Sequence, residues 1–550
     1  MAQRPAAPAD GRPSRLAIVG LDGATFRVLD PMRRAGAMPA LSRIVDRGVR
    51  AVLRSTVPAY TPPAWIAMST GVNPGRHGVF GFLENTPQED PRIAHSGSVS
   101  VPTLWDYLNK QSVRAGIFNV PMSYPPVDVE GFLVSGGLAA GWVDEAMPNF
   151  ASRPEVAELV TRVAGGTYPL DTVVSYENDW RSAQTAARIE DVQRLRRRVL
   201  AALLEHEDPR VLFAVFEGAD RLSHVHYQYF VETSEWYGRP EAAEMRDRAR
   251  SYFEEVDRAI ADIVEWAGAD GHVILVSDHG SGPWEKTLNV NLLLHEWGLL
   301  GLPSLSRLTR AGMVAGVGQR VARRPLPRRL LLAGKARVNR GIDWSSTRGF
   351  ASQVAEQGIH INERDALPHG VVDAASVRGV EDEIIERLRE LVDPSDGRPV
   401  VDAVVRRDDV IRGPHAARAP HLFPFCRDQR YELSDTLAAA SVLTDHRDRP
   451  WGYHHMDGVF IAAGPAFVND ALADPLEIVD VLPTALHAAG LSVPEGLDGR
   501  VVDAVLTPAL ARAPVRTSSE EVRVSSAEYP FSREEEAEIE ESLRGLGYIE

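Results

Sequence analysis

The chain has 550 residues, with 60 basic and 76 acidic side chains, so its formal charge is −16. Hydrophobic residues make up 44% and charged residues 25% of it, which is typical of a folded globular protein and argues against disorder. The acidic balance argues against binding to a nucleic-acid polymer, since such binding rests on a basic surface. The length predicts roughly two to four domains, or one large α/β core with insertions.

Cys426 is the only cysteine, so neither an intrachain disulfide nor a zinc site built from several cysteines can form. Residues 1–14 are rich in Ala, Pro and Arg and lack the apolar stretch of a secretory signal. The chain has no run of about 18 apolar residues, so we expect no transmembrane segment. These features together predict a cytoplasmic protein.

Short apolar runs that end beside an aspartate recur along the chain. They predict strands at 15–20, 211–216 and 272–277. Apolar residues at helical spacing over 253–264 predict a helix between the last two strands. A strand–helix–strand unit favours a mainly parallel sheet with helices on both faces. Further strands are expected at 115–120 and 458–464, and a further helix over 189–203.

The segment from Gly301 to Arg340 holds ten Arg or Lys residues and no acidic residue. Two interpretations stay open: a solvated face of an inserted helical cap, or a rim that attracts an anionic substrate or lipid headgroup. The predicted organisation is a flexible N-terminus (1–14), an α/β catalytic core (15–295 and 431–512), an inserted cap (296–430) and an acidic tail with a short helix (513–550).

Three predicted strands deliver acidic residues at their carboxyl ends, where open parallel sheets bind ligands, so these residues are expected to converge. Alone, each aspartate is more often a helix cap or a turn residue. The aspartates are Asp22, Asp220 and Asp278, and the nearby histidines are His224, His279, His454 and His455. Carboxylate and imidazole without thiolate suit Zn²⁺ or Mn²⁺. So many ligands imply two ions, which suit an in-line displacement at phosphorus.

Thr61 is the candidate nucleophile. It precedes Pro62, Pro63 and an apolar stretch, the pattern of an N-cap followed by proline at the first helical position. A threonine there lies at the positive end of the helix dipole, beside backbone N–H groups that can hold a phosphoryl oxygen. Metal coordination would activate its hydroxyl, and the alternative is a purely structural cap.

These residues, in this order, resemble the alkaline phosphatase superfamily, and most closely its type I phosphodiesterase and nucleotide pyrophosphatase branch. The window TPPAWIAMSTGVNPGRHG (61–78) is similar to the nucleophile segment of that branch. The threonine is followed by x-Pro, by Thr-Gly nine residues on, and by His-Gly sixteen residues on. The resemblance covers about 16–77, 211–291 and 452–499.

The resemblance implies an alkaline-phosphatase-like sandwich with an inserted cap, and two divalent metal ions, zinc or alternatively manganese. One ion would be held by Asp22, Thr61, Asp278 and His279, and the other by Asp220, His224 and His454. His454 is preferred to His455 because the branch pattern Gly-x-His-x-x-x-Gly matches Gly452, His454 and Gly458. Thr61 would attack a small-molecule phosphate ester or anhydride and form a phosphothreonine that water hydrolyses, with net retention at phosphorus.

Departures from the family pattern leave the specificity open. Members of this branch usually carry an asparagine after the nucleophile segment, but here Phe82 stands near that place and Asn85 follows slightly later. A sulfatase is disfavoured, because Thr61 cannot mature to formylglycine and Trp65 fills the position of the sulfatase arginine. The alternatives are a phosphomonoesterase, a phosphoryl transferase, or a catalytically silent relative that binds an anion. The substrate-binding residues and the oligomeric state stay open.

Five further polar residues near the predicted site are not expected to bind metal. His77 is expected to order the loop after the nucleophile helix, and His226 to be structural. Lys286, Asn289 and Asn291 follow Asp278 closely enough to reach a crevice, but each is a weak candidate for a substrate contact.

Overall fold

The computed structural model describes residues 14–84, 88, 92–137, 142–144, 148–172, 174, 176–303, 341–352, 357–525 and 527–545. Residues 1–13 of the predicted flexible N-terminus, Asn85 and nearly all of the basic segment 301–340 lie outside these residues. The described residues fall into two compact units. The first lies within Met1–Val79, Ala94–Gly282 and Pro450–Leu546, and the second within Phe80–Ile93 and Pro283–Arg449. The predicted insertion at 296–430 falls within the second unit, and the predicted domain boundaries themselves stay a prediction.

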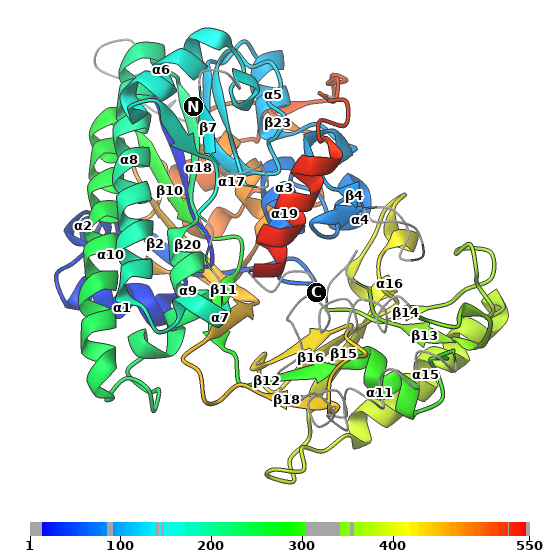
Figure 1. Ribbon diagram of the computed structural model, residues 1–550. Coiled ribbons are helices and arrows are strands. Elements are labelled where there is room, and N and C mark those ends of the chain that lie inside the picture. The colour runs from blue at the N-terminus through cyan, green and yellow to red at the C-terminus, as the bar shows by residue number, and fades with distance from the viewer. Residues whose placement is uncertain are drawn as a thin grey trace. The chain divides into compact units, whose positions relative to one another are not determined.

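A mixed sheet forms the centre of the first unit (Figure 1). Among the described residues it has nine strands, of which β20 runs antiparallel to β2 and β10 while the other pairings are parallel. In sheet order the strands are β21 (Ala471–Leu472), β2 (Val49–Arg54), β20 (Asp457–Ala463), β10 (His272–Val276), β1 (Leu16–Leu21), β9 (Val211–Phe216), β5 (Ala115–Pro121) and β6 (Gly131–Gly136), with β22 (Leu476–Glu477) beside β2. The predicted α/β fold with a mainly parallel sheet is therefore confirmed.

Helices cover both faces of this sheet (Figure 1). Leu16 and Ile18 of β1 share a core with α3 (Thr61–Thr70), α5 (Leu104–Lys110) and α17 (Val481–Ala488). The alternate residues of β1 are buried as well, because α10 packs on the opposite face. Burial on both faces explains why the strands read as continuous apolar runs. The second layer consists of α2 (Pro39–Asp46), α6 (Pro154–Ala164), α8 (Ala183–Glu207) and α10 (Pro240–Ala267).

The C-terminal segment packs onto the first unit. Its helix α19 (Arg533–Gly545) lies in the predicted acidic tail and buries Ile539 and Leu543, and the Phe531 ring stacks on Tyr124 with 5.6 Å between centroids. The remaining elements of this unit are α1 (Phe26–Arg34), α4 (Pro74–His77), β7 (Trp142–Asp144), β8 (Thr167–Pro169), α7 (Tyr176–Asp179), α9 (Gly218–Phe230), β11 (Gly280–Pro283), β19 (Gly452–His455), β23 (Val493–Pro494), α18 (Pro508–Ala511) and β24 (Thr517–Ser518).

The second unit has its own apolar core, which includes Leu294, Ile361, Ile384 and Leu422. In the described residues this unit contains a three-stranded sheet and three two-stranded pairs. The strands are β3 (Leu83–Glu84), β4 (Arg92–Ile93), β12 (Lys286–Asn289), β13 (Gly349–Phe350), β14 (His360–Ile361), β15 (Val401–Arg406), β16 (Leu422–Cys426), β17 (Tyr431–Ser434) and β18 (Leu443–Asp445), and the helices are α11 (Val290–Glu296), α15 (Ala374–Glu390) and α16 (Arg407–Val410).

The three polar residues that follow Asp278 make bonds within this second unit. Lys286 Nζ lies 2.5 Å from an oxygen of the Asp393 carboxylate. Asn289 Nδ2 donates a hydrogen bond to the Ser441 carbonyl, and Asn291 Nδ2 donates one to the Asp435 carbonyl. These hydrogen bonds satisfy the three buried side chains, so no contact with a substrate is needed to explain their burial.

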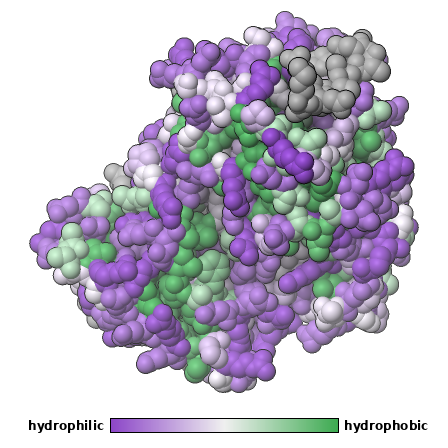
Figure 2. Space-filling view, turned by 180° about the vertical axis from the view of Figure 1, so that it is seen from behind, coloured by the Kyte–Doolittle hydropathy of each residue, from purple (hydrophilic) through white to green (hydrophobic). Residues whose placement is uncertain are grey.

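Hydrophilic side chains cover most of the face shown in Figure 2, with patches of hydrophobic residues between them. In the part of the chain that the structure describes, four large hydrophobic side chains are exposed, and Leu472 is the most exposed at 81%. No described helix combines the length and the apolar character needed to cross a membrane.

A buried ion pair joins α8 to the start of α9. Arg196 is 1% exposed and pairs with Glu217, which also accepts a 3.0 Å hydrogen bond from Thr172 Oγ1. Removing one partner of such a pair leaves an uncompensated buried charge, so we expect Arg196→Met to lower the free energy of unfolding by about 3–5 kcal/mol. Urea unfolding followed by circular dichroism measures this loss.

Arg198 offers a matched control, because its side chain is exposed on the same helix. Arg198→Met is expected to cost less than about 1 kcal/mol. Combining Arg196→Met with Glu217→Leu removes both charges and should recover most of the loss. An unfolding midpoint of Arg196→Met equal to that of the wild type would show that the pair does not stabilise this unit.

Candidate active site

Three aspartates meet at the carboxyl edge of the central sheet. Strand β1 lies between β9 and β10, and all three run parallel, so their carboxyl ends are neighbours. Asp22 directly follows β1, Asp278 follows β10, and Asp220 lies in the first turn of α9, just after β9. Their side chains are buried, with residue exposures of 3%, 0% and 1%.

Gly23 makes the close approach of these strand ends feasible. Its φ of +63° is a conformation that favours glycine, and a Cβ atom there would lie 2.8 Å from Asp220 Oδ1. The Gly23 N–H donates a 3.2 Å hydrogen bond to Asp278 Oδ1. The turn after β1 therefore fixes one carboxylate while leaving room for another.

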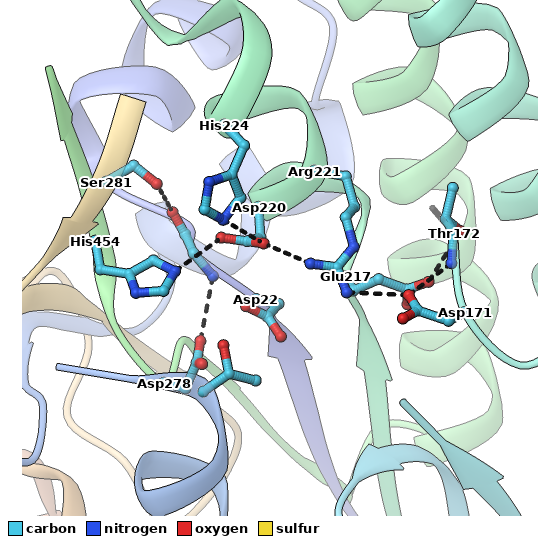
Figure 3. A network of polar contacts seen from close by, with 12 residues as sticks. Asp22, Asp171, Thr172, Glu217, Asp220, Arg221, His224, Asp278, Ser281 and His454 are labelled. Atoms are coloured by element: carbon cyan, nitrogen blue, oxygen red, sulfur yellow. Dashed lines mark hydrogen bonds and ion pairs between the residues drawn. The ribbon is translucent and has the colours of Figure 1, made fainter. Parts of the chain in front are cut away.

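Two groups of buried side chains could each hold a metal ion. The first is Asp22, Asp278 and His279, and the second is Asp220, His224 and His454. Within each group the ligand atoms lie within 4.8 Å of one another. The rings of His279 and His454 join the two groups, with 4.1 Å between their centroids. Figure 3 shows His224, His454 and Asp220 together, with Asp22 and Asp278 beside them.

Asp220 and His224 share one face of α9 because they are four residues apart in a helix. The distance between His224 Nε2 and Asp220 Oδ2 is 3.2 Å. His226 turns to another face, where its Nε2 lies 3.1 Å from the Trp180 carbonyl oxygen. Residues two apart in a helix lie on different faces, so His226 points away from His224.

Thr61 joins the first group through its hydroxyl, since Oγ1 lies 3.2 Å from His279 Nε2. It is the first residue of α3, and Tyr60 is the N-cap, so the predicted N-cap position is wrong by one residue. The sequence also predicted several free backbone N–H groups beside Thr61, but this turn has fewer. Pro62 and Pro63 lack an N–H, and the Ala64 N–H donates to the Tyr60 carbonyl, which leaves the Thr61 N–H as the donor of this turn.

The two adjacent histidines of β19 point in different directions, because successive side chains alternate along a strand. His454 lies in the second group, whereas His455 Nδ1 accepts a 3.1 Å hydrogen bond from the Asp457 N–H. His77 Nδ1 accepts a hydrogen bond from the Val79 N–H in the loop after α4.

Further side chains hold the candidate ligands in place. His279 Nδ1 lies 3.0 Å from the Gly280 carbonyl, which can only accept, so Nδ1 carries the proton and Nε2 is left to bind a metal. Tyr176 OH contacts His224 Nδ1, so His224 Nε2 faces Asp220. Sequence reasoning missed Tyr176, and no local pattern could have found it.

Arg221 was missed as well, although it directly follows Asp220 in the chain. Its Nη1 donates a 3.0 Å hydrogen bond to Asp220 Oδ2, and its Nη2 donates one of 3.0 Å to Asp171 Oδ1 (Figure 3). Asp171 thus anchors the guanidinium that holds one oxygen of a candidate metal ligand.

The site concentrates negative charge in a buried volume. Burial raises the pKa of Asp22 well above its usual value, and Asp278 and Asp220 raise it further. Burial and Asp220 likewise raise the pKa of Asp278. Burial alone would raise the pKa of Asp220 too, but His224, Arg221 and His279 together outweigh burial and lower it. Burial lowers the pKa of His454, and this favours the neutral imidazole that binds metals.

These residues fit divalent metal ions. Asp22 Oδ1 and Asp278 Oδ2 are buried, and no described donor forms a hydrogen bond with either atom. Such oxygens are costly in a protein interior unless a cation or donor compensates them. With neutral imidazoles beside them, they form the oxygen and nitrogen ligand set that zinc and manganese accept.

Comparisons with known proteins identify the family and the fold of the chain. The model of the family described as "Type I phosphodiesterase / nucleotide pyrophosphatase" matches residues 16–436. No curated protein matches the chain. Phosphonoacetate hydrolase from Sinorhizobium meliloti 1021, solved with phosphonoformate, aligns with a TM-score of 0.52 at 19% identity and covers 87% of this chain and 96% of that chain. Its complex with phosphonoacetate aligns with the same TM-score at 18% identity, over the same shares of the two chains.

Murine ectonucleotide pyrophosphatase / phosphodiesterase 5 in complex with AMP aligns with a TM-score of 0.47 at 13% identity, over 90% of this chain and 100% of that one. At these identities the phosphonoacetate hydrolase shows a shared fold alone, which is the alkaline-phosphatase-like fold that the sequence predicted. The family match, in contrast, spans most of the chain and includes the nucleophile segment 61–78. The chain therefore belongs to the type I phosphodiesterase / nucleotide pyrophosphatase family and is a hydrolase of phosphoric ester bonds.

Proposed function

We propose that the chain is a phosphodiesterase or pyrophosphatase that uses Thr61 as its nucleophile and two divalent metal ions as cofactors. The observation that carries this proposal is the position of Thr61 Oγ1, 3.2 Å from His279 Nε2 at the edge of one buried ligand group. The second group lies alongside, since the His279 and His454 ring centroids are 4.1 Å apart. Two metal ions side by side can stabilise both the attacking and the leaving oxygen of an in-line displacement at phosphorus, so a hydroxyl at the edge of the first group, with the second group alongside, supports this reaction.

Within this proposal each side chain has a defined task. Thr61 Oγ1 attacks phosphorus, the first alcohol or phosphate leaves, and a water molecule then hydrolyses the phosphothreonine. Each displacement inverts phosphorus, so the two together retain its configuration. The Thr61 N–H, at the positive end of α3, is the backbone group available to a phosphoryl oxygen.

The metal ligands are the predicted ones: Asp22, Thr61, Asp278 and His279 for one ion, and Asp220, His224 and His454 for the other. Bound zinc, or alternatively manganese, would stabilise the charge on the attacking and leaving oxygens. His279 and His224 each have Nδ1 engaged by a neighbour, so they present Nε2 to the site without a change of rotamer. A small-molecule phosphate ester or anhydride is the proposed substrate, and the cytoplasmic location stays a prediction.

A comparison of two chromogenic esters tests this function. For the zinc-loaded protein we expect kcat/KM for bis-p-nitrophenyl phosphate to exceed that for p-nitrophenyl phosphate by roughly tenfold or more. Both activities should disappear after chelation and return when zinc or manganese is added. A preference for the monoester would favour a phosphomonoesterase. Absence of turnover in a protein that retains two metal equivalents would favour a highly selective enzyme or a transferase, whereas a silent relative should not retain both equivalents.

A further inference from the structure

One buried tryptophan touches the candidate metal site from the nucleophile helix. Trp65 Nε1 donates a 3.1 Å hydrogen bond to Asp22 Oδ2. Trp65 is fully buried and Asp22 is 3% exposed, so water does not compete for this bond. The other carboxylate oxygen, Asp22 Oδ1, lies 3.7 Å from His279 Nε2 and accepts no hydrogen bond from a described residue. The indole thus occupies one oxygen of Asp22 and leaves the other facing the site.

The surroundings of the indole keep it in this orientation. Gly20 of β1 lies against it, and a Cβ atom at that position would be 2.9 Å from Cζ3 and closer still to Cη2 of Trp65. On another side the indole contacts the Phe213 ring, with 6.0 Å between centroids. Glycine within a central strand normally weakens the strand. The space that Gly20 leaves for the indole explains why glycine occupies this position.

Trp65 and Thr61 are four residues apart on α3, hence on the same face of the helix. One helical turn therefore carries the candidate nucleophile and the donor that holds Asp22. The hydrogen bond ties the nucleophile helix to the end of β1, from which Asp22 projects.

We propose that Trp65 is a positioning residue for the metal centre: its indole N–H fixes the Asp22 carboxylate so that Oδ1 points to the metal ion of the first group. This inference rests on the metal site of the proposed function. Side chains that orient metal ligands typically change metal affinity by about 10–100-fold when they are replaced. The second group, Asp220, His224 and His454, has no bond to Trp65 in the described residues and should be unaffected.

Zinc binding by calorimetry, calibrated by competition with a chelator, tests the proposal without measuring activity. We expect the wild type to bind two equivalents. In Trp65→Phe, which keeps an aromatic ring but lacks the N–H, one equivalent should bind about 10–100-fold more weakly while the other keeps its affinity. Gly20→Ala pushes the indole away from Asp22 and is expected to produce the same selective loss from a different strand.

Trp105→Phe is the matched control, because Trp105 is a buried core residue of the same unit, on α5. It loses the same volume and should keep both zinc affinities. Unchanged binding in Trp65→Phe would overturn the proposal, and so would an equal weakening of both sites that Trp105→Phe reproduces, since that indicates general loss of packing. A wild type that binds no zinc would refute the proposed metal site itself, and this outcome is distinguishable because it appears before any substitution.

Discussion

Thr61→Ala is expected to lower kcat for a diester substrate by roughly 10³-fold or more, because the variant lacks the atom that attacks phosphorus. The methyl side chain of alanine fits the buried position, so KM and the unfolding midpoint should change little. Thr61→Ser keeps the hydroxyl but loses the methyl group that restricts its rotation, and we expect a rate at most about 100-fold below that of the wild type. Steady-state kinetics on the zinc-loaded proteins measure both effects.

Acid quenching during turnover gives a second, independent readout. A phosphoryl group should be found by mass spectrometry on the peptide that contains Thr61, and it should be absent from the alanine variant. Thr70→Ala is the control, since Thr70 lies on the same helix and its Oγ1 donates a 2.6 Å hydrogen bond to the Ile66 carbonyl. Its activity should match the wild type. Inversion at phosphorus in a chiral diester would exclude the covalent step, because a single displacement inverts and two displacements retain.

Much of the fold could be predicted because the strands of the central sheet are buried on both faces. The apolar run Val211–Phe216 coincides with β9. The predicted strand at 15–20 differs from β1 by one residue at each end, and the predicted strand at 272–277 differs from β10 by one residue at its carboxyl end. The direction of β20 could not be predicted, because an apolar run carries no sign of whether it pairs parallel or antiparallel. The helix expected over 253–264 is the last part of the longer α10. Residues 240–251 carry six charged side chains and bury only Ala242, Met245 and Ala249, so their apolar pattern is too sparse to predict a helix.

The candidate site was predictable to the extent that each side chain lies beside a strand end. Asp22 and Asp278 follow apolar runs directly, and parallel strands bring such positions together. The residues that orient them were not predictable, because their contacts join distant parts of the sequence: Trp65 lies 43 residues from Asp22, and Tyr176 lies 48 residues from His224. The roles of the site residues as metal ligands stay predictions until metal content is measured.

Asp278→Asn is expected to change stability in opposite directions with and without metal. Asparagine keeps an oxygen for the Gly23 N–H and removes the charge from a carboxylate that lies close to Asp22 and Asp220. The metal-free variant should therefore be more stable than the metal-free wild type by about 1 kcal/mol. Zinc at about 100 times its Kd should stabilise the wild type by roughly 2.7 kcal/mol per site, and the variant should lose this gain at the first site. Thermal unfolding with chelator and with added zinc measures both differences.

Asp257→Asn separates this effect from the ordinary cost of replacing a buried aspartate. Asp257 is also buried, but its two oxygens accept hydrogen bonds of 2.9 and 2.8 Å from the N–H groups of Ala40 and Leu41. Its replacement should destabilise the metal-free protein by about 1–3 kcal/mol and leave the stabilisation by zinc intact. If Asp278→Asn behaves in the same way, Asp278 is a structural residue and the first metal group is wrong. If the metal-free protein is stabilised by Asp278→Asn and destabilised by Asp257→Asn, the carboxylate at position 278 is repulsive in the fold and is present because it binds a metal ion.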